Sequence, residues 1–161
     1  MKAVLAALLA IFVAACASVG AGKLVPGQSS AGDVQAAMGS PSEKTTNAAG
    51  EMVWFYTSAP NGRTTYAVRM RPDGTVVAVE QRLAEQYWSQ IAPERTTTKE
   101  VRELLGPPAE IAHWALRGVD EWDYKVEQNY RKFDLLIEVS PEGIVRRYAL
   151  LHDPIYDAPF P

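Results

Sequence analysis

The chain has 161 residues, of which 47% are hydrophobic and 9% aromatic, and its formal net charge at pH 7 is -3. This composition fits one globular domain or two small ones and excludes an intrinsically disordered chain. Because the charge is mildly acidic and no basic face is apparent, we expect no nucleic-acid partner.

Residues 1–15 have the pattern of a signal peptide. Lys2 gives a positive start, and residues 3–15 carry no polar side chain before Cys16. Such a run is too short for a membrane-spanning helix, which needs about 20 apolar residues. A cut before Cys16 would leave 161 − 15 = 146 residues, with a net charge of -4 because Lys2 is lost.

The sequence "VAAC" at residues 13–16 resembles the lipobox of bacterial lipoproteins, in which the thiol is acylated, for example with palmitate. Cys16 is thus the expected lipid attachment site, and residues 16–26 the lipidated Cys with a short linker. In lipoproteins of this kind, an Asp directly after the Cys implies retention in the inner membrane. This chain has Ala17 at that position, so the resemblance implies the outer membrane. An ordinary secretory cut and a buried core Cys are the alternatives.

Two segments have the pattern of short capped helices, "GQSSAGDVQAAMGSP" (27–41) and "ERTTTKEVRELLGPP" (94–108). Ser30 with Asp33, and Thr97 with Glu100, form candidate capping boxes. Apolar residues follow at helical spacing in both segments. Each helix then ends at a glycine followed by proline, and we expect left-handed C-terminal caps at these glycines.

Strands follow each helix, because the apolar period changes to two. On the covered faces we expect Tyr66, Val68 and Met70 in the first half, and Trp122, Tyr124, Val126, Phe133, Leu135, Ile137 and Val139 in the second. Turns at 72–74 and 141–143 connect antiparallel strands with one covered and one wet face.

The two halves match along the sequence. The helix segments align at an offset of 67, "GEMVWFY" (50–56) lies over "GVDEWDY" (118–124), and "RPDGTV" (71–76) lies over "SPEGIV" (140–145). The order of three matching blocks predicts a tandem duplication. We predict an α+β fold of two tandem helix-helix-three-stranded antiparallel sheet repeats, with the helices on one sheet face.

The expected organisation has six parts. They are a signal peptide (1–15), the lipidated Cys and linker (16–26), a first α+β repeat (27–83), a linking helix (84–91), a second α+β repeat (92–152) and a proline-rich tail (153–161). Because a unit of about 60 residues buries little apolar surface, we expect the halves to share a core or a continuous sheet.

The motif order resembles the small protein A, OmlA or BamE family of outer-membrane lipoproteins. The residues that carry the resemblance are Gly27, Val34, Gly39, Pro41, Trp54 and Tyr56, and then Val101, Gly106, Pro108, Trp122 and Tyr124. Glu94 stands where the family has glycine. The duplicated form resembles the fold of the beta-lactamase inhibitory proteins. The resemblance implies helices packed on antiparallel sheets, and a role in beta-barrel outer-membrane protein assembly.

We therefore expect a non-catalytic lipoprotein on the periplasmic face of the outer membrane, with envelope proteins, including the beta-barrel assembly complex, as partners. The alternative is a periplasmic recognition or inhibitor module that binds an enzyme on its open sheet face. The candidate binding residues on that face are Phe55, Arg69, Arg71, Asp123, Lys125, Asp134, Leu136 and Glu138. A small apolar ligand between sheet and helices is a third possibility.

The sequence contains no recognisable catalytic motif. His113 and His152 have no neighbouring Cys or His at metal-ligand spacing, and we expect both to be ordinary surface residues. Asp120 and Glu121 are adjacent and would point to different sides of a strand. We expect no enzyme activity, no cofactor and no metal.

Overall fold

The computed structural model describes residues 20–152, which form an α+β fold with two four-stranded antiparallel sheets. The helices are η1 (Ala21–Lys23), α1 (Ala31–Met38), α2 (Glu85–Trp88) and α3 (Thr98–Leu105). Sheet 1 has the strands β1 (Glu43–Thr46), β2 (Met52–Thr57), β3 (Thr65–Met70) and β4 (Val76–Gln81). Sheet 2 has the strands β5 (Glu110–Trp114), β6 (Val119–Gln128), β7 (Arg131–Val139) and β8 (Val145–His152).

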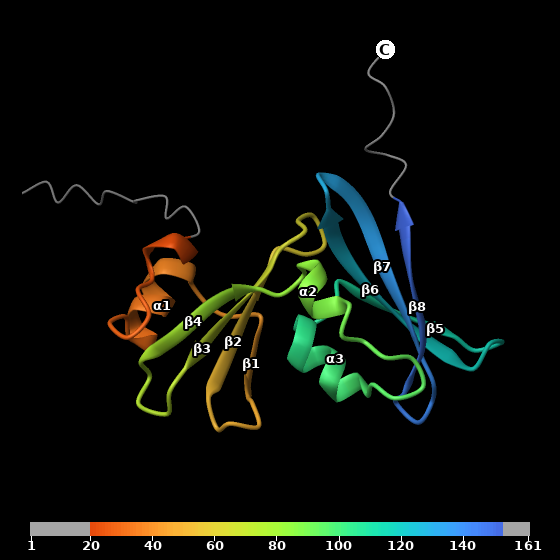
Figure 1. Cartoon of the computed structure of the whole chain (residues 1–161), viewed down its shortest axis with the longest axis horizontal. Helices are drawn as coiled ribbons and strands as arrows, with labels where there is room; N and C mark the ends of the chain where they lie inside the picture. Colours follow the sequence, from red (N-terminus) through yellow and green to blue (C-terminus); the bar gives the residue numbers. More distant parts are fainter. Residues whose placement is uncertain (1–19, 153–161) are drawn as a thin grey trace, which may run out of the picture.

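Helices and sheets alternate along the long axis of the molecule. Figure 1 shows α1 at one end, then sheet 1, then α2 and α3, and sheet 2 at the other end. Val34 of α1 is buried in a cluster with Val68 and Met70 of sheet 1. Val101 and Leu105 of α3 belong to a second cluster with sheet 2. Each sheet therefore has its own core beneath the helix that precedes it in the chain.

Each sheet has one strand more than the sequence predicted, so the expectation of three strands was wrong. The missed strands are β1 and β5, which lie at the edges of their sheets. All four residues of β1 are polar, and none is fully buried. Because neither face of β1 contributes to the core, its sequence carries no apolar period from which a strand could be inferred.

The two helix starts have the same local structure. In α1 the Ser30 hydroxyl accepts from the Asp33 N–H and the Ser30 N–H donates to the Asp33 carboxylate, and Thr97 and Glu100 repeat both bonds in α3. The predicted capping boxes are thus confirmed. Because these bonds satisfy orphan N–H groups of the first turn, each helix has a fixed starting point.

The two helix ends also match, with a difference from the expected caps. Gly39 and Gly106 both have positive φ, 76° and 81°, but their ψ values of -151° and -162° lie outside the left-handed helical region. This conformation is open essentially to glycine alone. The hydroxyl of Tyr56 donates to the carbonyl of Gly39 at 3.4 Å, and that of Tyr124 donates to Gly106 at 3.0 Å.

Of the two expected arrangements, a shared core or a continuous sheet, the continuous sheet is not found, because the strands form two separate sheets. The C-terminal end of α3 instead lies against sheet 1 on the face opposite α1. A Cβ built on Gly106 would lie 2.7 Å from Cδ1 of Phe55 and 3.0 Å from Cγ2 of Thr65. Arg102 of α3 also donates a hydrogen bond to the carboxylate of Glu43 in β1. The helix of the second half thus covers the second face of the first sheet.

Residues 20–26, expected to be part of a linker, belong to the fold. They include η1, and Leu24 is buried in the cluster beneath α1.

No helix within residues 20–152 is long and apolar enough to cross a bilayer.

Comparing the two helix-end glycines tests the contact between the halves. Gly39→Ala should lower the free energy of unfolding by about 1–3 kcal/mol, because alanine is strained at this φ. Gly106→Ala should lower the free energy of unfolding by about 1–3 kcal/mol more than Gly39→Ala does, since the added Cβ also meets the buried ring of Phe55. Urea unfolding of both variants measures the difference, and equal losses would contradict a tight contact at Gly106.

The two tyrosines offer a second matched pair. Tyr124→Phe leaves the Gly106 carbonyl without its donor in a site where Tyr124 is 1% exposed. We expect a loss of about 1–3 kcal/mol. Tyr56→Phe should cost less, because its bond is longer and Tyr56 is 9% exposed. Thermal unfolding of both variants measures the two losses, and a larger loss for Tyr56→Phe would contradict this ordering.

Candidate protein-binding surface

Five of the candidate residues share one face of sheet 2, the face opposite α3. Asp123 pairs with Leu136, and Lys125 pairs with Asp134, in the register of β6 and β7. Directly opposed residues point to the same side of an antiparallel sheet, and Glu138 is two residues beyond Leu136. Trp122, Tyr124 and Val126 point to the other side, into the core beneath α3. We call the first side the outer face of sheet 2.

A lysine lies between two aspartates on this outer face. Nζ of Lys125 is 2.6 Å from Oδ2 of Asp123 and 3.0 Å from Oδ2 of Asp134. Burial opposes the Lys125 charge, but its bonds to Asp123 and Asp134 outweigh burial and raise its pKa. Burial raises the pKa of Asp123, although Lys125 acts in the opposite direction. Oδ1 of Asp123 is buried and accepts no hydrogen bond within residues 20–152.

Arg63 connects the first half to this cluster. It lies in the loop between β2 and β3, and its Nη1 donates to the carbonyl of Phe133 at 2.6 Å. The same atom is 3.4 Å from Oδ1 of Asp134. The Arg63 side chain is 12% exposed, so the bond is largely shielded from water. Sequence reasoning missed this residue, because a lone arginine in a polar loop gives no signal of a distant partner.

Glu138 is the centre of a second cluster on the outer face. Its carboxylate accepts from Nε of Arg147 at 2.7 Å and from Nη1 of Arg117 at 2.8 Å. Arg147 is the main reason that the pKa of Glu138 is lowered. Glu138 is 13% exposed, whereas Arg147 is 67% exposed. The charges that an approaching protein meets here are thus largely paired beforehand.

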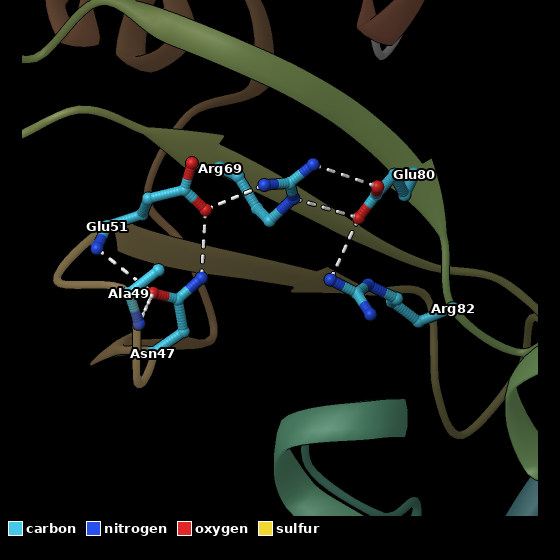
Figure 2. A network of polar contacts seen from close by, with 6 residues as sticks. All are labelled: Asn47, Ala49, Glu51, Arg69, Glu80 and Arg82. Carbon is cyan, nitrogen blue, oxygen red and sulfur yellow. Dashed lines mark hydrogen bonds and ion pairs between the residues drawn. The ribbon is translucent and has the colours of Figure 1, made fainter. Parts of the chain in front are cut away.

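Arg69 and Arg71 do not join this face. Arg69 lies on sheet 1, where its Nη1 is 2.6 Å from Glu51 and its Nη2 is 3.3 Å from Glu80. Figure 2 shows this network continuing to Asn47 and Arg82, with a helix on the same side of the sheet. Arg71 follows the end of β3 and is exposed. Arg69 therefore links β3 to β4 and to the residue that precedes β2, and both sides of its guanidinium are already paired.

Phe55 is not an exposed anchor, and that expectation was wrong. Its side chain is 0% exposed, as is that of Ala67, its partner on β3. Phe55 was expected on the open sheet face, and it does lie on the side of sheet 1 opposite the core beneath α1. The sequence could not reveal that the end of α3 covers this second face.

Two of the exposed large apolar residues that sequence reasoning passed over lie close together at one hairpin. Trp114 ends β5 and is 47% exposed, and Leu116 lies in the turn to β6 and is 105% exposed. The guanidinium carbon of Arg117 lies 4.8 Å from the Trp114 ring centroid. The signal in the sequence was that a tryptophan and a leucine stand just before Gly118, a glycine that suits a turn, where large apolar side chains would be exposed.

The two histidines lie in different surroundings on sheet 2. His113 is exposed and lies 2.7 Å from Asp120, and His152 packs edge-on against Phe133. Within residues 20–152 no three His, Cys, Asp or Glu side chains are grouped as a metal site. A groove of about 690 Å³ lies between the halves, and its lining includes Arg63, Glu127 and Lys132. Cys16 and the tail 153–161 lie outside the described residues.

Comparisons with known proteins do not assign a family. No protein-family model matches the chain, and no curated protein matches it. The chain is similar to a solved structure of a DUF4309 family protein, YjgB, from Bacillus subtilis. The identity is 17%, the match covers 81% of this chain and 82% of that one, and the TM-score is 0.33. A similarity at this level supports no functional argument.

The Arg69 network can be tested through its pH dependence. The pKa of Glu51 is lowered from its ordinary value of 4.5, mainly because its carboxylate is bonded to Arg69. The ionised Glu51 therefore stabilises the fold above that value, and the stabilisation is lost as the pH falls through the lowered pKa. Arg69→Met should lower the urea midpoint at pH 7. The difference in urea midpoint between this variant and the wild type should become smaller at acid pH.

The matched control is Arg147→Met, which removes an arginine that is 67% exposed. Because exposed ion pairs contribute little, its unfolding free energy should stay within about 1 kcal/mol of wild type at pH 7. A gap for Arg69→Met that does not change between neutral and acid pH would contradict the role given to Glu51.

Proposed function

We propose that this protein is an outer-membrane-anchored periplasmic lipoprotein that supports envelope integrity or beta-barrel protein assembly by binding other proteins, without catalysis. The observation that carries the proposal is the sequence "VAAC" ending at Cys16, directly after the positive start and apolar run of residues 1–15. The exposed apolar hairpin and the paired charges of sheet 2 suit a protein-binding role.

The start of the fold is compatible with an anchor at Cys16. The described structure begins at Gly20, four residues after Cys16. A chain advances at most about 3.8 Å per residue, so Gly20 would lie within about 15 Å of the lipidated residue. The end of the molecule that carries α1 would then stay close to the membrane.

The matching caps, helix ends and register of the two halves support a tandem duplication of one α+β unit. A duplicated unit with an outer face also keeps the second candidate function open, a recognition module that binds a periplasmic enzyme. The observation favouring it is Leu136, an apolar residue among the charge pairs of Asp123, Lys125, Asp134 and Glu138 on one face.

The anchor is tested by Cys16→Ser. Without the thiol no acyl chain can be attached, so the variant should disappear from the outer-membrane fraction and should not incorporate labelled palmitate. The matched control is Ala17→Asp, which keeps the thiol and should move the protein to the inner membrane. Cys16→Ser protein that still fractionates with the outer membrane would refute the anchor.

The partner is tested by crosslinking the native protein in cells and identifying attached proteins by mass spectrometry after solubilising the outer membrane. Recovery of the barrel-assembly complex supports the leading proposal. Recovery of one soluble periplasmic enzyme supports the recognition module instead.

A further inference from the structure

The groove between the halves has one wall from each of them. One wall is the loop between β2 and β3, residues 61–64, and the other is the hairpin between β6 and β7, where Glu127 and Lys132 lie. Figure 1 shows this loop beside the end of the hairpin. The charged side chains of the lining are Arg63, Glu127 and Lys132, so two cations face one carboxylate.

The last described strand ends beside this groove. His152 at the end of β8 pairs with Phe133 of β7 and packs edge-on against its ring. Nη1 of Arg63 donates to the carbonyl of the same Phe133 at 2.6 Å. Paired residues of antiparallel strands have Cα atoms only about 4.5–5.5 Å apart. The chain therefore leaves the described fold next to a cation of the groove.

The register of β7 and β8 indicates which residue would meet the groove first. Leu151 pairs with Asp134 and His152 pairs with Phe133, so the next pair along the ladder would be Asp153 with Lys132. Phe133 packs against the core beneath α3, and its neighbour Lys132 therefore belongs to the outer face. Directly opposed residues point to the same side of the sheet, and opposite charges in such a pair attract each other.

The sequence that follows His152 suits the groove in charge and in length. Residues 153–161, "DPIYDAPFP", contain two carboxylates, Asp153 and Asp157, and no cation. Nine extended residues span up to about 30 Å, which is enough to cross from β8 to the loop of the first half. The three prolines restrict the unbound segment, so docking it costs less conformational entropy.

We propose that the groove between the halves is the docking site of residues 153–161 of the same chain, with the Asp153 carboxylate held between Arg63 and Lys132. A guanidinium presents five N–H donors in a fork, so the bonds of Arg63 through Nη1 are compatible with a carboxylate at its other nitrogens. Pro154 has no N–H with which to extend the ladder, and the segment leaves β8 there for the groove.

The docked segment would connect the end of the second half to the loop of the first half. It would also lie on the part of the outer face that borders the groove, where Arg63 approaches Asp134. A protein that binds this part of sheet 2 would therefore compete with residues 153–161. The inference does not depend on the proposed anchor at Cys16.

The first test measures where the segment lies. Cys16 is the only cysteine, so the full chain with Cys16→Ser and Ala158→Cys, purified in detergent, takes one nitroxide label at position 158. We expect the label to broaden the amide signals of Gly62 and Thr64 in the groove. The signals of Ser89 and Gln90, at the end of α2 on the other side of sheet 2, should stay sharp. Asp153→Asn should abolish the broadening in the groove.

The second test measures the contact of Asp153 through a double-mutant cycle. Asp153→Asn should lower the urea midpoint of the full chain, and the effect should disappear in the Arg63→Met background. Arg63→Met alone also removes the bond to Phe133, so only the difference between the two backgrounds reports on Asp153. The matched control is Asp157→Asn, which makes the same charge change four residues further on and should leave the midpoint unchanged.

Three results would overturn the inference. The first is broadening in the groove that is absent, or that is equal with Asp153 and with Asn at this position. The second is broadening that appears when the nitroxide and the observed amides are on separate chains, because a second copy would then occupy the groove. The third is an equal effect of Asp153→Asn in both backgrounds. The fractionation of Cys16→Ser tests the anchor separately, so the docking and the proposed function can fail independently.

Discussion

The arrangement of the molecule depends on the close approach of the α3 end to sheet 1. Gly106 has a backbone conformation open essentially to glycine, and the absence of a Cβ lets this backbone lie against the ring of Phe55. Phe55 and Ala67 are consequently buried on the side of sheet 1 that α1 does not cover. Arg102 and Glu43 add a charged hydrogen bond beside the contact. The two halves are thus stacked in sequence, with the helix of the second half between the two sheets.

This stacking explains why corresponding faces of the two sheets differ in chemistry. On the face of sheet 1 that receives α3, the residues include Val53, Phe55 and Ala67 beside Arg69; the register positions of Val53, Phe55 and Ala67 are held in sheet 2 by Glu121, Asp123 and Leu136. No helix within residues 20–152 follows sheet 2 to cover it. A sheet face that no helix covers needs polar side chains to stay soluble. The charge pairs around Lys125 and Glu138 supply that face, with few charges left unpaired.

Much of the local structure could be predicted from the sequence, because capping boxes, helix ends and period-two alternation are determined by near neighbours. Alternation alone placed five residues together on one face of sheet 2, namely Asp123, Lys125, Asp134, Leu136 and Glu138. The stacking could not be predicted, since alternation places Phe55 away from α1 without showing what lies on the other side. The polar edge strand β1, the reach of Arg63 and the exposure of Leu116 also depend on contacts between distant segments, which leave no periodic pattern.

The differences between the halves separate structural constraints from functional ones. Glu94 occupies the position of Gly27, yet its φ of 60° is close to the 79° of Gly27. Both N–H groups donate to corresponding carbonyls, of Val145 and Val76, so this backbone geometry is retained despite the strain on a non-glycine residue. At the β5–β6 turn no such bond demands the side chains present, and a tryptophan and a leucine stand where the first half has asparagine and alanine. The Trp114 ring lies against the Arg117 guanidinium, which pairs with Glu121 and Glu138, so the second turn is joined to the charge network of sheet 2, whereas the first turn is closed by Asn47 alone.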